Sequence, residues 1–157
     1  MKYFIISELL KSDTAIGKKI WNGANREQED NLIALVSAVL DPLREKYGKA
    51  VTVTSGFRCL AVNKTVGGAV TSQHTKGEAA DIVGVTGDKN ENYILGRLIV
   101  ALGNYDQVIF ENVGNNNLMP EWIHVSWRRR GDNRHNIMKK VKGSSSYVNI
   151  TAKDLGL

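Results

Sequence analysis

The stretch from Ser72 to Ile82 reads SQHTKGEAADI and carries the most informative pattern in the chain. It places His74 in a glycine-containing loop and Asp81 inside an apolar segment that is typical of a β-strand. An ionised carboxylate in such a strand needs a cation, a hydrogen-bond network or a metal, because burying it unpaired is costly. A turn at Gly77 would bring His74 and Asp81 to one point.

A second histidine lies in a similar context, in the stretch PEWIHVS at residues 120–126. His124 sits within an apolar strand, and Glu121 precedes it by three positions. The third histidine of the chain, His135, lies in a polar run instead. Residues three apart on a regular strand face opposite sides, so Glu121 and His124 reach one site only if Pro120 starts the strand with a bend.

Two imidazoles and one carboxylate, from His74, His124 and Asp81, form a ligand set that suits Zn²⁺ and leaves a fourth position for water. A carboxylate beside such a site, here Glu121, is expected to act as a general base in hydrolysis of an amide. The alternative is structural. Each histidine is then an ordinary core residue, and Asp81 pairs with Arg58.

The remaining pattern predicts helices first and strands later. A short helix is expected near residues 4–10, a long one from Asn25 to before Gly48 with a kink at Pro42, and another over 89–102. Strands are expected at 51–54, 79–83, 107–110 and 122–126, with loop and short helix between 55 and 77. The order favours an α+β domain with a largely antiparallel sheet.

Composition fits one domain spanning residues 1–157, with 42% apolar residues. Twenty-one Lys and Arg against sixteen Asp and Glu give a net charge of +5, which favours a polyanionic partner such as the bacterial wall or nucleic acid. The basic residues are densest at 128–130, followed by Arg134 and several lysines. No helix-turn-helix, zinc-finger or aromatic RNA-binding pattern accompanies them, so nucleic acid is the weaker alternative.

The chain lacks the features of exported or membrane proteins. Its single cysteine, Cys59, cannot form an internal disulfide. Its N-terminus does not resemble a signal peptide, and no apolar run approaches the roughly 20 residues of a membrane-spanning helix. We therefore expect a monomer that is made in the cytoplasm and acts at the cell wall after release.

These motifs resemble those of the M15-type zinc D,D-peptidases and phage endolysin peptidases. Residues 72–81 match the family pattern S-x-H-x-x-G-x-A-x-D at every fixed position, and residues 121–124 match its E-x-x-H pattern. The segment Ser55 to Arg58, with Asn63 shortly after it, is similar to the family segment that precedes the metal motif. All three motifs occur in the family's order.

The resemblance implies the fold shared with Hedgehog signalling domains, a central antiparallel sheet flanked by helices. It also implies that His74, Asp81 and His124 bind Zn²⁺ and that Glu121 is the general base. The implied substrate is a stem peptide of peptidoglycan, cut either at a terminal D-Ala-D-Ala bond or at an internal L-Ala-D-Glu type bond. The resemblance to small phage lysis enzymes slightly favours the endopeptidase, and it leaves a phage or a bacterial origin open. A non-catalytic zinc-binding module on the same fold is the alternative.

By the same resemblance, Arg58 reaches into the cleft, where its guanidinium stabilises an oxyanion or binds a substrate carboxylate. Ser72 and Trp122, which lie within the two metal motifs, are expected to contact substrate as well. The chain departs from the family at Cys59 and Leu60, where Ser-Pro is usual. Leu60 lacks the fixed backbone angle of proline, which puts substrate preference in doubt before activity.

Overall fold

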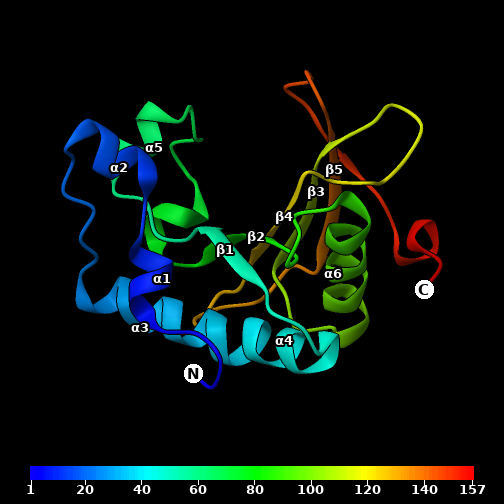
Figure 1. Cartoon of the computed structure of the whole chain (residues 1–157), viewed down its shortest axis with the longest axis horizontal. Helices are drawn as coiled ribbons and strands as arrows, with labels where there is room; N and C mark the ends of the chain where they lie inside the picture. Colours follow the sequence, from blue (N-terminus) through cyan, green and yellow to red (C-terminus); the bar gives the residue numbers. More distant parts are fainter.

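A six-stranded sheet forms the centre of the computed structural model, which describes residues 1–157 (Figure 1). The strands lie in the order β1-β2-β4-β3-β5-β6, and only the β3–β5 pair is parallel. Their bounds are β1 Thr52–Ser55, β2 Ala79–Val83, β3 Gln107–Val113, β4 Trp122–Ser126, β5 Asn136–Val141 and β6 Tyr147–Asn149. The predicted α+β class with a mostly antiparallel sheet is confirmed.

Helices flank this sheet (Figure 1). The α-helices are α1 Ile6–Leu10, α2 Asp13–Lys18, α3 Arg26–Leu35, α4 Asp41–Tyr47, α5 Leu60–Thr65 and α6 Lys89–Leu102. A π-helical segment, Val36–Leu40, joins α3 to α4, and short 3₁₀ turns cover Gln73–Lys76 and Ala152–Leu155. None of these helices is both long enough and apolar enough to cross a bilayer.

The predicted interruption at Pro42 takes the form of the π-helical segment. The Asn25 side chain caps α3 by accepting a hydrogen bond from the backbone N–H of Gln28, as the sequence predicts. Near Pro42, which has no N–H, the backbone N–H of Asp41 bonds to the carbonyl of Val36, five residues back. The chain therefore passes the proline within one continuous helical run.

The two faces of the sheet differ in chemistry, because successive side chains of a strand point to opposite sides. Phe110, Ile123 and Val125 face a core of 23 buried residues into which α6 packs. The side chains between them, including His124 and Glu111, point to the other face. One face of the sheet thus builds the core, and the other is free to build a site.

Two strands, β5 and β6, were not among the predicted elements. They lie in the segment that the sequence marks only as basic, because in β5 only Ile137 is buried and its neighbours Lys139 and Lys140 are partly exposed. β6 is exposed along its whole length. Strands with so little buried apolar surface, here the edge strand β6 and its neighbour β5, give a weak sequence signal.

Helix α6 approaches the sheet closely at Gly96. A Cβ atom added there would lie 2.5 Å from Cζ of Phe110 and 2.8 Å from Cδ1 of Ile123. Since both contacts are far inside van der Waals distance, the glycine is what allows the helix to rest directly on β3 and β4.

Gly96→Ala is expected to destabilise the fold by about 1–3 kcal/mol, because overpacking outweighs the gain in helix propensity. Gly17→Ala in α2 is the matched control, since no atom lies within 4 Å of its added Cβ. That change should be neutral or stabilising by up to about 1 kcal/mol. Urea unfolding of both variants measures the difference, and equal free energies of unfolding would contradict the close approach.

Candidate active site and metal centre

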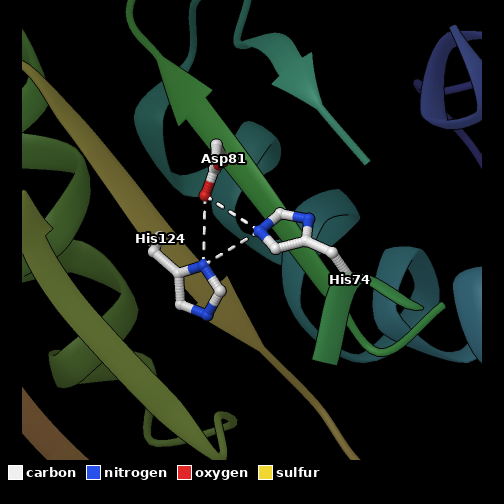
Figure 2. A group of neighbouring side chains, drawn as sticks. All are labelled: His74, Asp81 and His124. Carbon is white, nitrogen blue, oxygen red and sulfur yellow. Dashed lines mark hydrogen bonds and ion pairs between the residues drawn. The ribbon is translucent and has the colours of Figure 1, made fainter. Parts of the chain in front are cut away.

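Three predicted ligand residues come together from three separate elements (Figure 2). His74 lies in the 3₁₀ turn before β2, Asp81 on β2, and His124 directly opposite Asp81 on β4. Nε2 of His74 lies 3.2 Å from Oδ1 of Asp81 and 3.2 Å from Nδ1 of His124. The third side of this triangle, from Nδ1 of His124 to Oδ1 of Asp81, measures 3.0 Å.

The backbone fixes the tautomer of His74. Its Nδ1 lies 2.7 Å from the carbonyl oxygen of Gly56, which can only accept, so Nδ1 carries the proton. In the neutral ring Nε2 then presents a lone pair to the other two atoms of the triangle. Gly56 can support this contact because its backbone lies so close to Leu9 that a Cβ would sit 2.2 Å from the Leu9 carbonyl oxygen.

The geometry of the triangle suits zinc. Tetrahedral coordination with bonds of about 2.0–2.1 Å places neighbouring ligand atoms about 3.3 Å apart. The three distances of 3.0–3.2 Å therefore match one face of a zinc tetrahedron. A lone pair facing a carboxylate oxygen needs a shared cation or an extra proton, so the donor set fits a divalent metal.

Arg58 holds the other oxygen of Asp81. Its Nη2 lies 2.6 Å from Oδ2 of Asp81, and its Nε donates to Oγ of Ser55 at 2.9 Å. Burial opposes ionisation of Asp81, but the two imidazoles outweigh it, so the pKa of this carboxyl lies well below its ordinary value. The Asp81–Arg58 pair and the His–Asp–His cluster thus coexist, each on its own carboxylate oxygen.

A cavity of about 790 Å³ opens over the cluster. Its floor is the non-core face of the sheet, where Asp81, His124, Ile109 and Met138 lie in one cross-strand row. The remaining residues named from sequence as substrate contacts also line it, namely Arg58, Ser72 and Trp122. These placements are compatible with the roles expected from sequence.

Glu121, the base expected from sequence, does not join the residues that line the cavity. It sits in the bend before β4 that the sequence predicts, but its carboxylate accepts hydrogen bonds from Nδ2 of Asn112 at 2.9 Å and Nζ of Lys142 at 2.7 Å. It does not line the cavity. Lys142, then Asn112, hold the pKa of Glu121 at about 2. The expectation that the bend turns this carboxylate toward the cluster is not met, because the bend presents it to Lys142.

A different carboxylate, Glu111, lies in the cavity. It follows Ile109 by two residues on β3 and pairs with Trp122 on β4, so it shares the face of His124. It is 7% exposed, and no protein group donates a hydrogen bond to its carboxylate. Burial raises its pKa, although the charges of His124 and Lys140 partly oppose that rise. The alternation of side-chain directions along β3 could have indicated Glu111 from sequence, but the predicted strand ended at Phe110.

A family comparison bears on this geometry. The model of the family described as Peptidase M15 matches residues 2–103, more than half of the chain. The chain belongs to the Peptidase M15 family. It is therefore a hydrolase of the metallopeptidase type. No curated protein matches it.

The family match places His74 and Asp81 of this M15 peptidase within the matched segment. His124 and Glu111 lie beyond residue 103, so their place in the site rests on the sheet register and the cavity.

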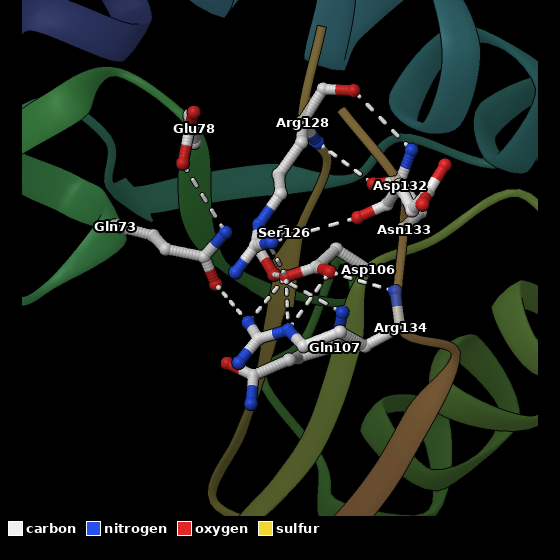
Figure 3. A network of polar contacts seen from close by, with 9 residues as sticks. All are labelled: Gln73, Glu78, Asp106, Gln107, Ser126, Arg128, Asp132, Asn133 and Arg134. Atoms are coloured by element: carbon white, nitrogen blue, oxygen red, sulfur yellow. Dashed lines mark hydrogen bonds and ion pairs between the residues drawn. The ribbon is translucent and has the colours of Figure 1, made fainter. Parts of the chain in front are cut away.

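A polar network lies at one end of the M15 peptidase's cavity (Figure 3). Its centre is Asp106, which is fully buried just before β3. The backbone N–H and the guanidinium of Arg134 both donate to this carboxylate, and Nε of Arg128 lies 3.6 Å from it. Burial opposes ionisation of Asp106, but hydrogen bonds from Arg134 outweigh it and lower the pKa to about 2.

The stability of the M15 peptidase should depend on this carboxyl at low pH. Since its folded pKa lies below the ordinary 3.8, ionised Asp106 contributes about 2 kcal/mol above pH 4, and this is lost as pH falls toward 2. The free energy of unfolding should therefore differ between wild type and Asp106→Asn by a constant amount from pH 5 to 7. The gap should shrink between pH 4 and 2. Urea unfolding across this range measures it, and a gap at pH 2.5 as large as the gap at pH 5 would contradict the pairing.

Proposed function

We propose that this chain is a zinc-dependent peptidase that hydrolyses a bond in the stem peptides of bacterial peptidoglycan. The observation that carries the proposal is the cluster of His74, Asp81 and His124 on a cavity floor that also holds the unpartnered carboxylate of Glu111. Family membership supplies the reaction class. The site supplies a metal ligand set and a base.

His74, Asp81 and His124 would hold the metal through Nε2, Oδ1 and Nδ1. A zinc ion there would lower the pKa of a water molecule and polarise the scissile carbonyl. The Gly56 carbonyl keeps the His74 ring in the tautomer that ligation needs. Arg58 holds Oδ2 of Asp81, which leaves Oδ1 free to face the imidazoles.

Glu111 is the general base of this proposal, in place of Glu121. Diagonal neighbours on an antiparallel pair lie about 7–8 Å apart, within reach of a glutamate side chain, and Glu111 and His124 are such neighbours. Oε of Glu111 would accept the proton of the attacking water and return it to the departing amine nitrogen. A carboxyl whose pKa is raised by burial suits that task better than one held at about 2.

Glu121 is proposed to act indirectly, by positioning Glu111. The register of β3 and β5 shifts between Phe110 and Val113, so Glu111 and Asn112 bulge opposite one β5 residue. Asn112 has φ +54, and Glu121 accepts its side-chain hydrogen bond. Bulges of this kind re-aim side chains beside active sites. The Glu121–Asn112 contact would thus hold the bend that directs Glu111 into the cavity.

Cell-wall peptide is the proposed substrate for two reasons. The motifs resemble those of D,D-peptidases and endolysin peptidases, and the net charge of +5 favours the anionic wall. Arg58, Ser72 and Trp122 line the cavity and are the proposed substrate contacts nearest the metal. Both the terminal D-Ala-D-Ala bond and an internal bond of the L-Ala-D-Glu type remain open. The enzyme would act at the wall after release.

Digestion of purified peptidoglycan, followed by mass spectrometry of the new termini, tests the function and identifies the bond. Glu111→Gln is expected to reduce the rate about 100-fold or more, because the proton acceptor is lost. Glu121→Gln is the matched variant and should reduce it by less than about tenfold, since the amide can still contact Asn112.

Both variants should retain zinc, measured by elemental analysis, because neither residue is a proposed ligand. Wild-type activity should be lost on chelation and return with zinc. A Glu121→Gln enzyme as inactive as Glu111→Gln, or a fully active Glu111→Gln enzyme, would overturn the assignment of the base. Wild-type protein that is loaded with zinc and leaves peptidoglycan intact would overturn the function.

A further inference from the structure

The Asp106 network contains more positive charge than a structural ion pair needs. Arg134 alone satisfies the buried carboxylate, with its backbone N–H, Nε and Nη2 all donating to Asp106. Arg128 approaches the same carboxylate as a second guanidinium. Glu78 accepts a hydrogen bond from the amide of Gln73 at 3.3 Å, and its charge acts on Arg134 through space less strongly than that of Asp106. Two arginines therefore share one buried counter-charge (Figure 3).

Both arginines have free donor capacity at the cavity. The side chain of Arg134 is 37% exposed and that of Arg128 is 35% exposed, although Asp106 is fully buried. Nη1 of Arg134 and Nη2 of Arg128 have no hydrogen-bond acceptor in the protein, while both residues line the cavity. A buried carboxylate thus orients two guanidinium groups whose remaining donors are available to a ligand.

The network is joined to the metal ligands. Nη2 of Arg134 donates to Oε1 of Gln73, which is the residue next to His74. Ser126, two residues after His124 on β4, donates from its Oγ to Asp106. On the sheet, the Gln107–Ser126 pair lies two residues from the Ile109–His124 pair, or roughly 7 Å along the strands. Glu111 lies two residues away in the opposite direction.

The charge balance of the cavity agrees with an anionic ligand. Its cationic lining residues are Arg58, Lys76, Arg128, Arg134 and Lys140, whereas its carboxylates are Asp81 and Glu111. Arg58 is already paired with Asp81. The uncompensated positive charge therefore includes the arginine end, away from Glu111.

We propose that Arg134 and Arg128, oriented by Asp106, form a subsite that binds a carboxylate of the peptide substrate, remote from the bond that is hydrolysed. This inference rests on the proposed function and narrows it to acidic peptides. Since an extended residue spans about 3.3–3.6 Å, the carboxylate lies about two residues from the scissile bond. Arg134 and Arg128 bind the substrate, and Asp106 is a positioning residue.

The test uses three synthetic stem peptides that differ only in their carboxylates. One carries both the internal D-Glu carboxylate and the C-terminal carboxylate, and each of the others has one of these converted to an amide. Binding is measured by calorimetry in the zinc-loaded Glu111→Gln background, so that it does not depend on turnover. KM and kcat are measured with the otherwise wild-type enzyme.

One amidated peptide is expected to bind about tenfold or more weakly, because it loses a charge-assisted hydrogen bond to the arginines. Arg134→Gln and Arg128→Gln should each reduce this discrimination, through KM more than kcat. Arg130→Gln is the matched control, because Arg130 is exposed, pairs with Glu27 and lies outside the cavity lining. It should retain the discrimination. If the Arg134 variant fails to fold, Arg128→Gln still tests the subsite, because Arg128 makes only the longer contact to Asp106.

Equal binding of all three peptides would overturn the subsite and leave the proposed function intact if the peptides are hydrolysed. Full discrimination in both arginine variants would also overturn it. Discrimination in binding without any hydrolysis by wild type would support the subsite and count against the proposed function. Failure to bind any of the peptides would overturn both.

Discussion

The meeting of Nε2 of His74, Nδ1 of His124 and Oδ1 of Asp81 within 3.2 Å of one another is the constraint on which the site depends. The Gly56 carbonyl forces a lone pair onto Nε2 of His74 in the neutral ring. That lone pair faces a carboxylate whose ionised form is strongly favoured. Such an arrangement is favourable only with a cation or an extra proton between the atoms, because two unshielded acceptors at this distance repel each other in a buried setting.

The surrounding structure follows from the alternation of one sheet. Alternate residues of β3, β4 and β5 line the cavity, namely Gln107, Ile109, Glu111, Trp122, His124, Met138 and Lys140. Residues between them, including Val108, Phe110, Ile123 and Val125, belong to the core. A single face therefore presents the arginine end, the candidate metal cluster and the candidate base in that order along the strands. Gly96 lets α6 lie flat on the opposite face, and Gly56 lets the loop before α5 lie against α1. These two close backbone approaches thus fix the positions of the elements that carry the cavity face of the sheet.

The clustering of His74, Asp81 and His124 was predictable from sequence because each residue imposes a local conflict. A carboxylate in one apolar strand and a histidine in another are unfavourable there unless their side chains meet. The spacing of the motifs indicated which residues meet. The antiparallel sheet followed from strands clustered late in the chain. These features are local, so they can be recognised without knowing the fold.

The proposed base was not predictable in the same way. Glu121 fits the sequence motif, but its environment is set by Lys142 on the chain after β5, and β5 itself gave little sequence signal. Glu111 shares the face of His124 through its pairing with Trp122 on β4, and it lies next to a register shift between β3 and β5. The Asp106 network likewise joins residues that are distant in sequence. Long-range register, rather than residue type, determines which carboxylate enters the cavity.

The most direct test of the central claim is anomalous diffraction at the zinc absorption edge from crystals of the zinc-loaded protein. The account predicts one peak at about 2.0–2.2 Å from Nε2 of His74, Nδ1 of His124 and Oδ1 of Asp81, with nothing at the third histidine, His135. A peak elsewhere, or no peak while the three side chains remain hydrogen-bonded to one another, would contradict it.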